Sequence, residues 1–306
     1  MSPSALVINV PATVRAKALD LGAGAWLENL PGLTAALASA WGLRLGAPFQ
    51  DPTEAYVVEA TRSDGTPAVL KLLIPRPGRA AADEITFLRE AGGEASCRLL
   101  AYDQSLGVLL LERLGPALSD LNLPISRRLP ILSDLAVAVW RPTEAALPTG
   151  AERADRMSRY IRRKWTELGE PCGRAAIDQA LAAGESRRRA HAAGRAVLVH
   201  GDIHQWNAMR AGDGFKLVDP DGYVAEPACD LGVLLREDPA EGDPRDRCAW
   251  LAGRTGADPR AIWEWGLLDR VATGLTLTVA GLQPVAAQML AAADEIASAG
   301  TELFRP

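Results

Sequence analysis

The sequence predicts an α+β fold in which a small antiparallel sheet is followed by a mainly helical part. Two apolar runs with an alternating pattern, residues 55–61 and 68–74, are separated by a turn signal at residues 63–65, and together they predict a β-hairpin. Farther along the chain, apolar residues recur at helical spacing instead. This change of period predicts a strand-rich N-terminal part, residues 1–114, and a helical C-terminal part, residues 115–306.

The remaining elements follow from the same two periodicities. Helical spacing predicts helices over residues 26–41, 80–91, 125–140, 151–168, 174–193, 259–280 and 284–299. Short apolar runs predict further strands over residues 97–102, 107–114, 196–199 and 215–218, and residues 48–52 are expected to form a loop. The last two of these strands flank one polar loop in the middle of the helical part.

Composition limits the classes of function. The chain has 306 residues, of which 48% are hydrophobic and 23% are charged, as in ordinary globular proteins. Its net charge of -5 gives no electrostatic footprint for nucleic acid or an anionic membrane, and it suits a cationic small molecule. Residues 1–11 lack the pattern of a signal peptide and no run is long enough to span a bilayer, so we expect a cytoplasmic protein. The four cysteines form no CxxC pair, and we expect reduced, mostly buried thiols.

The polar loop between the two C-terminal strands carries the clearest chemical pattern. It reads Leu198-Val-His-Gly-Asp-Ile-His-Gln-Trp-Asn207 and holds two of the three histidines, His200 and His204. Asp202 and Asn207 are separated by four residues, a spacing also found in the catalytic loop of protein kinases. Phosphoryl transfer needs a carboxylate near the attacking hydroxyl and oxygen ligands for a metal on the phosphates. The loop therefore predicts a phosphoryl-transfer site.

Three further residues extend this pattern. Asp219 ends the second of the two strands, and together with Asn207 it offers the oxygen ligands that Mg²⁺ prefers. Lys71 is one of four lysines and lies inside an apolar strand, where its ammonium can contact ATP phosphates if a carboxylate holds it. Glu84 on the next predicted helix is the first candidate for that carboxylate, and Glu90 is the second.

The motif from His200 to Asn207, followed by Leu217-Val-Asp-Pro-Asp221, resembles the signature of aminoglycoside phosphotransferases. The resemblance covers about residues 26–235 and implies a two-lobed protein-kinase-like fold, with a nucleotide-binding N-terminal lobe and a catalytic, substrate-binding C-terminal lobe. Further segments resemble one branch of that family, the streptomycin 6-kinases and hydroxyurea phosphotransferases: residues 26–32, 41–43, 64–72, 83–88, 98–100 and 109–114.

The resemblance implies roles for the residues of the polar loop. Asp202 would orient or deprotonate the substrate hydroxyl, and Asn207 and Asp219 would bind Mg²⁺. His200 and His204 would support the loop rather than exchange protons with the substrate. The implied reaction is phosphoryl transfer from ATP to a hydroxyl of a small molecule, and an aminoglycoside such as streptomycin is the first expectation.

The resemblance also implies an ATP site in the N-terminal lobe. Lys71, paired with Glu84, would contact the phosphates. The main chain from Glu112 to Leu114 would hydrogen-bond the adenine. Asp230, in the C-terminal lobe, matches a family position near the polar loop and would support that loop.

Three segments depart from the family pattern. No glycine lies between Gly46 and Gly65, so the loop over residues 46–55 shows no glycine-rich phosphate cradle. Ala138-Val-Trp140 stands where relatives have a Leu-His stretch, and residues 242–260 contain no motif that we can interpret. These departures leave the phosphate cradle and the substrate unassigned.

Several of these residues also have a purely structural interpretation. Lys71 could be an exposed strand lysine, and Asp219 could cap a turn. The charged run of residues 185–189 predicts a solvated helix face. Acids between residues 226 and 243 either bind a cationic substrate or form an exposed loop, and Trp206 is the tryptophan in the polar loop itself.

Other functions remain open at this point. A kinase of an amino sugar, a choline-like alcohol or a hydroxyurea-like compound would use the same site, because a fold and a catalytic loop do not fix the substrate. A protein kinase is disfavoured because no APE-like segment follows Asp219. A pseudokinase would bind Mg-ATP without turnover, and a metal-dependent hydrolase or zinc protein would need more ligands than His200, Asp202 and His204. The sequence predicts neither the oligomeric state nor a preference between ATP and GTP.

Overall fold

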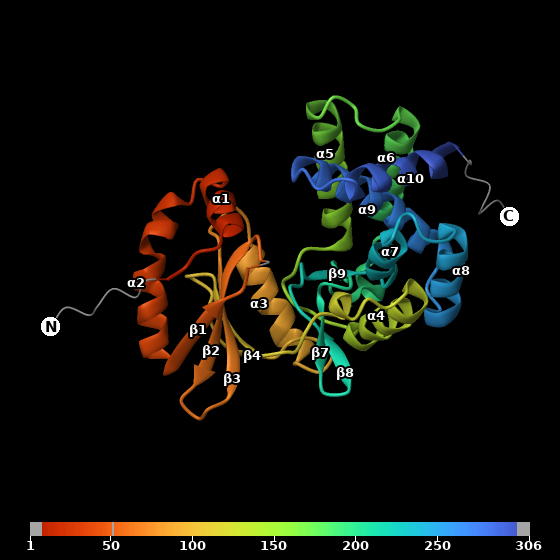
Figure 1. Cartoon of the computed structure of the whole chain (residues 1–306). Helices are drawn as coiled ribbons and strands as arrows, with labels where there is room; N and C mark the ends of the chain where they lie inside the picture. Colours follow the sequence, from red (N-terminus) through yellow and green to blue (C-terminus); the bar gives the residue numbers. More distant parts are fainter. Residues whose placement is uncertain (1–7, 51, 299–306) are drawn as a thin grey trace. The chain divides into compact units, whose positions relative to one another are not determined.

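The computed structural model describes residues 8–50 and 52–298, and it divides the chain into two units, Met1–Gly115 and Pro116–Pro306. The first unit contains a five-stranded antiparallel sheet and the second is mainly helical (Figure 1). The predicted α+β fold is thereby confirmed. The expectation that there is no signal peptide concerns residues 1–11, of which residues 1–7 lie outside the described residues.

The sheet of the first unit has the strand order β1-β2-β3-β5-β4, and each neighbouring pair is antiparallel. The predicted hairpin is β2–β3, in which Ala55 lies opposite Leu73 and Thr61 opposite Pro67. Sequence analysis missed the edge strand β1, because its run Leu-Arg-Leu-Gly-Ala-Pro ends in residues that are depleted in strands. The strands are β1 (Leu43–Pro48), β2 (Ala55–Arg62), β3 (Pro67–Leu73), β4 (Leu99–Asp103) and β5 (Val108–Glu112).

Three helices accompany this sheet. Val14, Leu30 and Leu37 of the first two helices share one buried core cluster with Leu70 and Leu72 of β3. The first helix was not predicted, because it buries only one large apolar side chain and shows little helical periodicity. The helices are α1 (Ala12–Asp20), α2 (Gly24–Ala40) and α3 (Ala80–Ala91).

The alternation of β3 determines where its lysine lies. Successive side chains of a strand point to opposite faces of the sheet. Leu70 and Leu72 belong to the core shared with α1 and α2, so Lys71 between them faces the other side. There it meets Glu84 of α3. The strand period therefore separates the lysine from the apolar core and brings it to a helix that carries a carboxylate.

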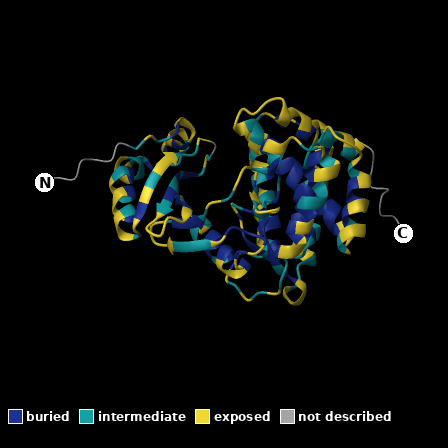
Figure 2. Cartoon of the chain, turned by 60° about the horizontal axis from the view of Figure 1, so that its bottom comes forward, coloured by how far each residue is buried: buried dark blue, intermediate teal, exposed yellow. Residues whose placement is uncertain are grey.

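The second unit is built around α9 (Pro259–Val279), which packs against α5, α6, α7, α8 and α10. Two short antiparallel pairs, β6–β9 and β7–β8, complete it. Figure 2 shows buried residues on the inner sides of these helices and exposed residues on their outer sides. The other helices are α4 (Ile125–Val139), α5 (Gly150–Glu167), α6 (Arg174–Ala190), α7 (Ala228–Arg236), α8 (Pro244–Thr255) and α10 (Val285–Ser298), with 3₁₀ turns at Leu118–Leu121 and Ala193–Arg195. The strands are β6 (Val197–Val199), β7 (Ala208–Ala211), β8 (Gly214–Leu217) and β9 (Tyr223–Ala225).

Two helices of this unit escaped prediction for different reasons. Every residue of α7 is buried, so the helix has no solvent-exposed polar face, and it is only nine residues long. α8 lies in the charged segment that we could not interpret, although it begins with a recognisable signal. The Asp243 side chain accepts a hydrogen bond from the Arg245 N–H at 2.8 Å, and Pro244 occupies the first turn.

The prediction of a solvated helix face over residues 185–189 is wrong for Arg187. Only 7% of this arginine is exposed, and its guanidinium donates to Glu264 at 2.6 Å and to Glu226 at 3.2 Å. Arg188 and Arg189 are exposed and pair with Glu185, as a solvated face requires. A run of three arginines thus divides between the core and the surface, because a helix turns neighbouring side chains to different faces.

All four cysteines are free and buried, as predicted. Burial raises the pKa of Cys172 and of Cys248 to about 11, which keeps both thiols protonated near neutral pH. Among the helices of the described residues, none has both the length and the apolar character that crossing a bilayer requires.

The contact between α7 and α9 gives a stability prediction. A Cβ on Gly232 would lie 2.8 Å from the carbonyl carbon of Trp265 and 2.9 Å from the Gly266 nitrogen, too close for real atoms. We expect Gly232→Ala to lower the free energy of unfolding by about 2 kcal/mol, because the two helices must separate. Gly253→Ala in α8 is the matched control, since nothing lies within 4 Å of its Cβ.

Urea unfolding measures both variants. The control should be unchanged or more stable by up to about 1 kcal/mol, since alanine is the better helix former. Equal stability of the two variants would contradict the close approach of α7 and α9.

Candidate functional site

The loop at residues 200–207, between β6 and β7, approaches its neighbours so closely that one position requires glycine. Gly201 has a φ of 87°. A Cβ there would lie 2.6 Å from the Tyr223 ring and 2.8 Å from Arg153 Nη1. Glycine adopts positive φ without strain and has no side chain to clash. The glycine of the sequence motif therefore lets the loop backbone lie against β9 and α5.

Asp230, in the first turn of α7, fixes the backbone of this loop. Its carboxylate accepts hydrogen bonds from the backbone N–H of His200 at 3.1 Å and of Gly201 at 2.7 Å. The Trp140 indole N–H donates to the same carboxylate at 2.9 Å, and Asp230 is fully buried. Trp140 stands where the family pattern has a Leu-His stretch, so here an indole contributes one of three donors. This geometry suits the loop-supporting role predicted for Asp230.

His200, as a neutral ring, connects the loop to Val218, the residue directly after β8. Its Nδ1 accepts from the Asp202 N–H at 3.2 Å, so the proton of a neutral ring is on Nε2, which donates to the Val218 carbonyl at 3.0 Å. His200 is fully buried, and burial lowers its pKa to about 4. A buried neutral ring with both nitrogens engaged supports the loop and has no proton to exchange with a substrate.

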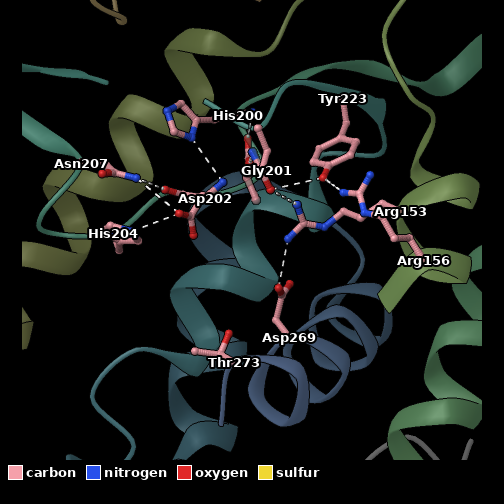
Figure 3. A network of polar contacts seen from close by, with 12 residues as sticks. Arg153, Arg156, His200, Gly201, Asp202, His204, Asn207, Tyr223, Asp269 and Thr273 are labelled. Carbon is pink, nitrogen blue, oxygen red and sulfur yellow. Dashed lines mark hydrogen bonds and ion pairs between the residues drawn. The ribbon is translucent and has the colours of Figure 1, made fainter. Parts of the chain in front are cut away.

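Three side chains fix the carboxylate of Asp202. Figure 3 shows two of them, His204 and Asn207. Arg236, at the end of α7, donates to Oδ1 at 2.9 Å. His204 Nε2 lies 3.2 Å from Oδ2, and the Asn207 amide donates to the same oxygen at 3.4 Å. Asp202 nevertheless keeps 37% of its side chain exposed. It is therefore held in one orientation while still open to a ligand.

Opposing effects set the protonation of Asp202 and His204. Burial favours the neutral carboxyl group, but the His204 ring and the Arg236 guanidinium outweigh it and hold the pKa of Asp202 well below its ordinary value. The pKa of His204 is raised, because the Asp202 carboxylate outweighs the opposite effect of burial. Asp202 is therefore ionised at neutral pH and a weak base, which suits it to orienting a hydroxyl more than to removing its proton early.

The two residues predicted to bind metal, Asn207 and Asp219, are linked through a backbone hydrogen bond next to Asp219. The Asn207 amide nitrogen also donates to the Asp202 carbonyl at 3.1 Å, which turns the amide oxygen away from Asp202. The Asn207 carbonyl accepts from the Val218 N–H at 2.9 Å, and the exposed Asp219 follows directly, with a φ of 55°. Within residues 8–50 and 52–298, no cluster of three or more His, Cys, Asp or Glu side chains could hold a metal ion.

In the first unit the structure brings Lys71 and Glu84 together. The Lys71 ammonium lies 2.7 Å from Glu84 Oε1, and both residues are buried. Glu90, the second candidate, lies near the exposed end of α3. The Glu112 backbone N–H donates to the Arg98 carbonyl at 3.0 Å, so this part of the predicted adenine contact is already engaged within the unit.

Three residues that shape the site are not among those that the sequence patterns predict. Arg236 binds Asp202, and Arg153 binds Asp269 at 3.0 Å and stacks on the Tyr223 ring at 4.8 Å. Arg236 carries a usable signal, because it is a charged residue that ends the apolar run of α7. Arg153 and Asp269 are 116 residues apart and belong to no motif, so only the folded chain reveals the pair.

A cavity of about 800 Å³ adjoins Asp202 in the second unit. Trp206 lines it and is 59% exposed, with its ring 5.6 Å from that of His204. Apolar side chains of α9 and α10, among them Leu277 and Met289, form part of the wall. The ionisable lining consists of six carboxylates (Asp202, Asp221, Glu237, Asp238, Glu241 and Asp269), three arginines (Arg153, Arg156 and Arg236), the His204 ring and the Tyr223 phenol. The wall is therefore acidic on balance.

Residues 46–263 match the family described as aminoglycoside/hydroxyurea antibiotic resistance kinase. A hydroxyurea phosphotransferase from Kitasatospora aureofaciens is 31% identical over 277 residues, which cover 85% of this chain and 78% of that protein. A streptomycin 6-kinase from Streptomyces glaucescens is 29% identical over 246 residues, which cover 77% of this chain and 76% of that protein. The resemblance to this branch is confirmed.

A solved structure shows the same fold. It is a thermostable mutant of aminoglycoside phosphotransferase APH(4)-Ia in a ternary complex with ADP and hygromycin B, and it matches with a TM-score of 0.62. The match covers 87% of this chain and 98% of that one at 16% sequence identity. At this identity the likeness shows the fold alone, and it confirms the predicted kinase-like fold.

The chain has only three histidines, which makes the protonation of the site directly measurable. In an NMR titration of the ring protons, we expect His200 to remain neutral at about pH 5, because burial disfavours its charged form. His204 should still carry its proton there, because Asp202 stabilises the imidazolium. The variants His200→Gln and His204→Gln assign the signals. A His200 that titrates above about pH 6 would contradict the buried neutral ring.

Proposed function

This chain belongs to the aminoglycoside/hydroxyurea antibiotic resistance kinase family, and on that premise we propose that it transfers the γ-phosphoryl group of ATP to a hydroxyl of a cationic small molecule. An aminoglycoside such as streptomycin is the first candidate for the acceptor. The observation that carries the proposal is Asp202, an ionised carboxylate that three side chains fix at the wall of a large acidic cavity.

In the proposed reaction the acceptor hydroxyl lies against Asp202 and its oxygen attacks the γ-phosphorus. The new P–O bond forms as the P–O bond to ADP breaks, and the hydroxyl proton passes to Asp202 late in the step. A loose phosphoryl transition state leaves little covalent chemistry to the protein, so orientation and charge neutralisation provide most of the acceleration. The lowered pKa of Asp202 agrees with a base that acts late.

Asn207 and Asp219 would hold Mg²⁺ on the phosphates, where the metal supplies positive charge that stabilises the transferring group. Both residues offer oxygen ligands, as a hard cation requires. The Asn207 amide oxygen is turned away from Asp202, and Asp219 follows the residue whose N–H binds the Asn207 carbonyl. The chemistry of these two donors supports Mg²⁺ as the ion that they would hold.

The first unit would bind the nucleotide. The buried pair of Lys71 with Glu84 holds the ammonium in one position, from which it can contact phosphate oxygens. Because the Glu112 N–H is engaged by Arg98, the adenine contact would come from the main chain of Arg113 and Leu114. The related complex of the same fold contains ADP, which supports an adenine nucleotide as the phosphoryl donor.

Cavity size and charge favour a large cationic acceptor over hydroxyurea. A cavity of about 800 Å³ lies in the range that buries a drug-sized ligand, whereas hydroxyurea has only a few heavy atoms. Two of the arginines in the wall are already paired, Arg236 with Asp202 and Arg153 with Asp269. Glu237 and Glu241 remain to bind ammonium or guanidinium groups of the acceptor. A kinase of hydroxyurea itself remains the second candidate, because a hydroxyurea phosphotransferase is 31% identical.

An assay of ADP release with Mg-ATP tests the proposal against streptomycin, other aminoglycosides, amino sugars, choline and hydroxyurea. We expect turnover with a cationic acceptor and a loss of at least about 100-fold in kcat for Asp202→Asn, because the amide cannot accept the hydroxyl proton. The affinity for Mg-ATP should stay unchanged in this variant. Full activity of Asp202→Asn would refute its role, and Mg-ATP binding without any turnover would favour a pseudokinase.

Asp219→Asn tests the metal site. Asparagine tolerates the positive φ of this position, so the exchange removes charge and leaves the backbone unstrained. We expect the Mg²⁺ concentration for half-maximal nucleotide binding to rise about tenfold or more, because a neutral amide binds a hard cation weakly. Asp213→Asn, at the exposed turn between β7 and β8, is the control. An unchanged Mg²⁺ titration in Asp219→Asn would exclude this residue as a ligand.

A further inference from the structure

A buried arginine of α4 joins two segments that border the cavity. Arg128 is 9% exposed, and its guanidinium makes two short hydrogen bonds to different parts of the chain. Nη1 donates to Gln205 Oε1 at 2.6 Å, and Nη2 donates to Asp238 Oδ2 at 2.7 Å. Gln205 is 77 residues away in the sequence and Asp238 is 110 residues away. Arg128 lines no part of the cavity itself, so its contribution is to hold its two partners relative to one another.

The first partner belongs to the 200–207 loop. Gln205 is 7% exposed and stands between His204, which binds Asp202, and Trp206, which lines the cavity. Its carbonyl accepts from the Ser119 N–H at 3.2 Å, so backbone and side chain are both held. Fixing Gln205 therefore fixes the half of the loop that positions Asp202 and Trp206.

The second partner belongs to the segment after α7, residues 237–241, which we name the acceptor loop. All five of its residues line the cavity. Asp238 has a φ of 45°, a conformation that an aspartate adopts only at some cost, and the ion pair with Arg128 stabilises it. Because its carboxylate binds Arg128, Asp238 stabilises the conformation of the acceptor loop. Glu237 and Glu241 line the cavity, where they can bind a ligand.

A second buried arginine holds the backbone of the acceptor loop. Arg247 of α8 donates to the carbonyls of Leu235, Glu237, Asp238 and Glu241. These bonds hold the loop against α8, but they do not connect it to the 200–207 loop. Among the hydrogen bonds of the described residues, Arg236 joins the residue directly before the acceptor loop to Asp202, and the acceptor loop itself is connected to the 200–207 loop through the Arg128 guanidinium.

We propose that Arg128 is a positioning residue that sets the distance between the cation-binding acceptor loop and Asp202. The proposal rests on the proposed function, since it assumes an acceptor whose cationic group binds Glu237 or Glu241 while its hydroxyl meets Asp202. A rigid planar guanidinium holds two acceptors in a fixed geometry, whereas a lysine ammonium on a flexible stem does not fix their directions. Arg128 thereby decides whether an acceptor held at its cationic end presents its hydroxyl to the carboxylate.

The test compares Arg128→Gln with Arg127→Gln, which removes the neighbouring exposed arginine of the same helix. In the steady-state ADP assay we expect kcat/KM for the acceptor to fall about 100-fold in Arg128→Gln, because a displacement of about 1 Å costs that much. The KM for the acceptor should rise while the KM for ATP stays within about twofold of the wild type. Arg127→Gln should match the wild type in every constant.

Two further variants separate positioning from mere destabilisation. Arg128→Lys should recover part of the loss, because an ammonium can reach one partner. Asp238→Asn should reproduce the rise in acceptor KM, and the double variant Arg128→Gln/Asp238→Asn should be no worse than either single variant. A fall in kcat that is fully explained by a smaller folded fraction, measured as the stoichiometry of Mg-ATP binding, would overturn the proposal. So would additive losses in the double variant.

Hydrogen exchange tests the same connection without any acceptor. In Arg128→Gln we expect faster amide exchange in both the 200–207 loop and the acceptor loop, with no change in β6 or α9, and no change anywhere in Arg127→Gln. If the wild type phosphorylates no cationic acceptor, the proposed function fails while this measurement still decides whether Arg128 joins the loops. If the wild type is active and Arg128→Gln keeps normal kinetics and exchange, the inference alone is wrong.

Discussion

The carboxylate of Asp230 is the contact on which the rest of the site depends. It is fully buried, and a buried carboxylate is costly unless donors surround it. Two of its three donors are backbone N–H groups of the 200–207 loop, so the charge is satisfied only when that loop takes this conformation. The loop in turn presses Gly201 against Tyr223 and presents His200 to Val218. Asp202 therefore reaches its position through a chain of contacts that begins at one buried charge.

A single helix, α7, supplies both the side chain that holds the backbone of the loop and the side chain that holds the Asp202 carboxylate. Asp230, in the first turn of α7, holds the loop backbone, and Arg236, the last residue of α7, holds the Asp202 carboxylate. All of its residues are buried, and Gly232 lets it lie against the backbone of α9. Close packing of interiors resists small displacements. The stability of the helical unit and the geometry of the site are therefore properties of the same contacts.

Local patterns predicted much of this molecule. The β2–β3 hairpin, α3 and the long helices have clear periods, and the proximity of Lys71 to Glu84 followed from a strand and the next helix. Two elements without a clear pattern were missed: α7 is short and buried on every side, and β1 ends in Gly-Ala-Pro. The partners of Asp202 and Asp230 could not be predicted in full, because Arg236 and Trp140 reach them across 34 and 90 residues. The charged run of residues 185–189 was predicted to be solvated throughout, but Arg187 within it is buried.

The central claim is that the acceptor itself gains the phosphoryl group at a hydroxyl. Mass spectrometry of streptomycin after incubation with the wild-type protein and Mg-ATP tests it most directly, because it observes the product rather than ADP. The account predicts an acceptor that carries one added phosphoryl group, formed in a one-to-one ratio with ADP. Formation of ADP with no phosphorylated molecule, for streptomycin or any other cationic acceptor, would show hydrolysis of ATP and contradict the account.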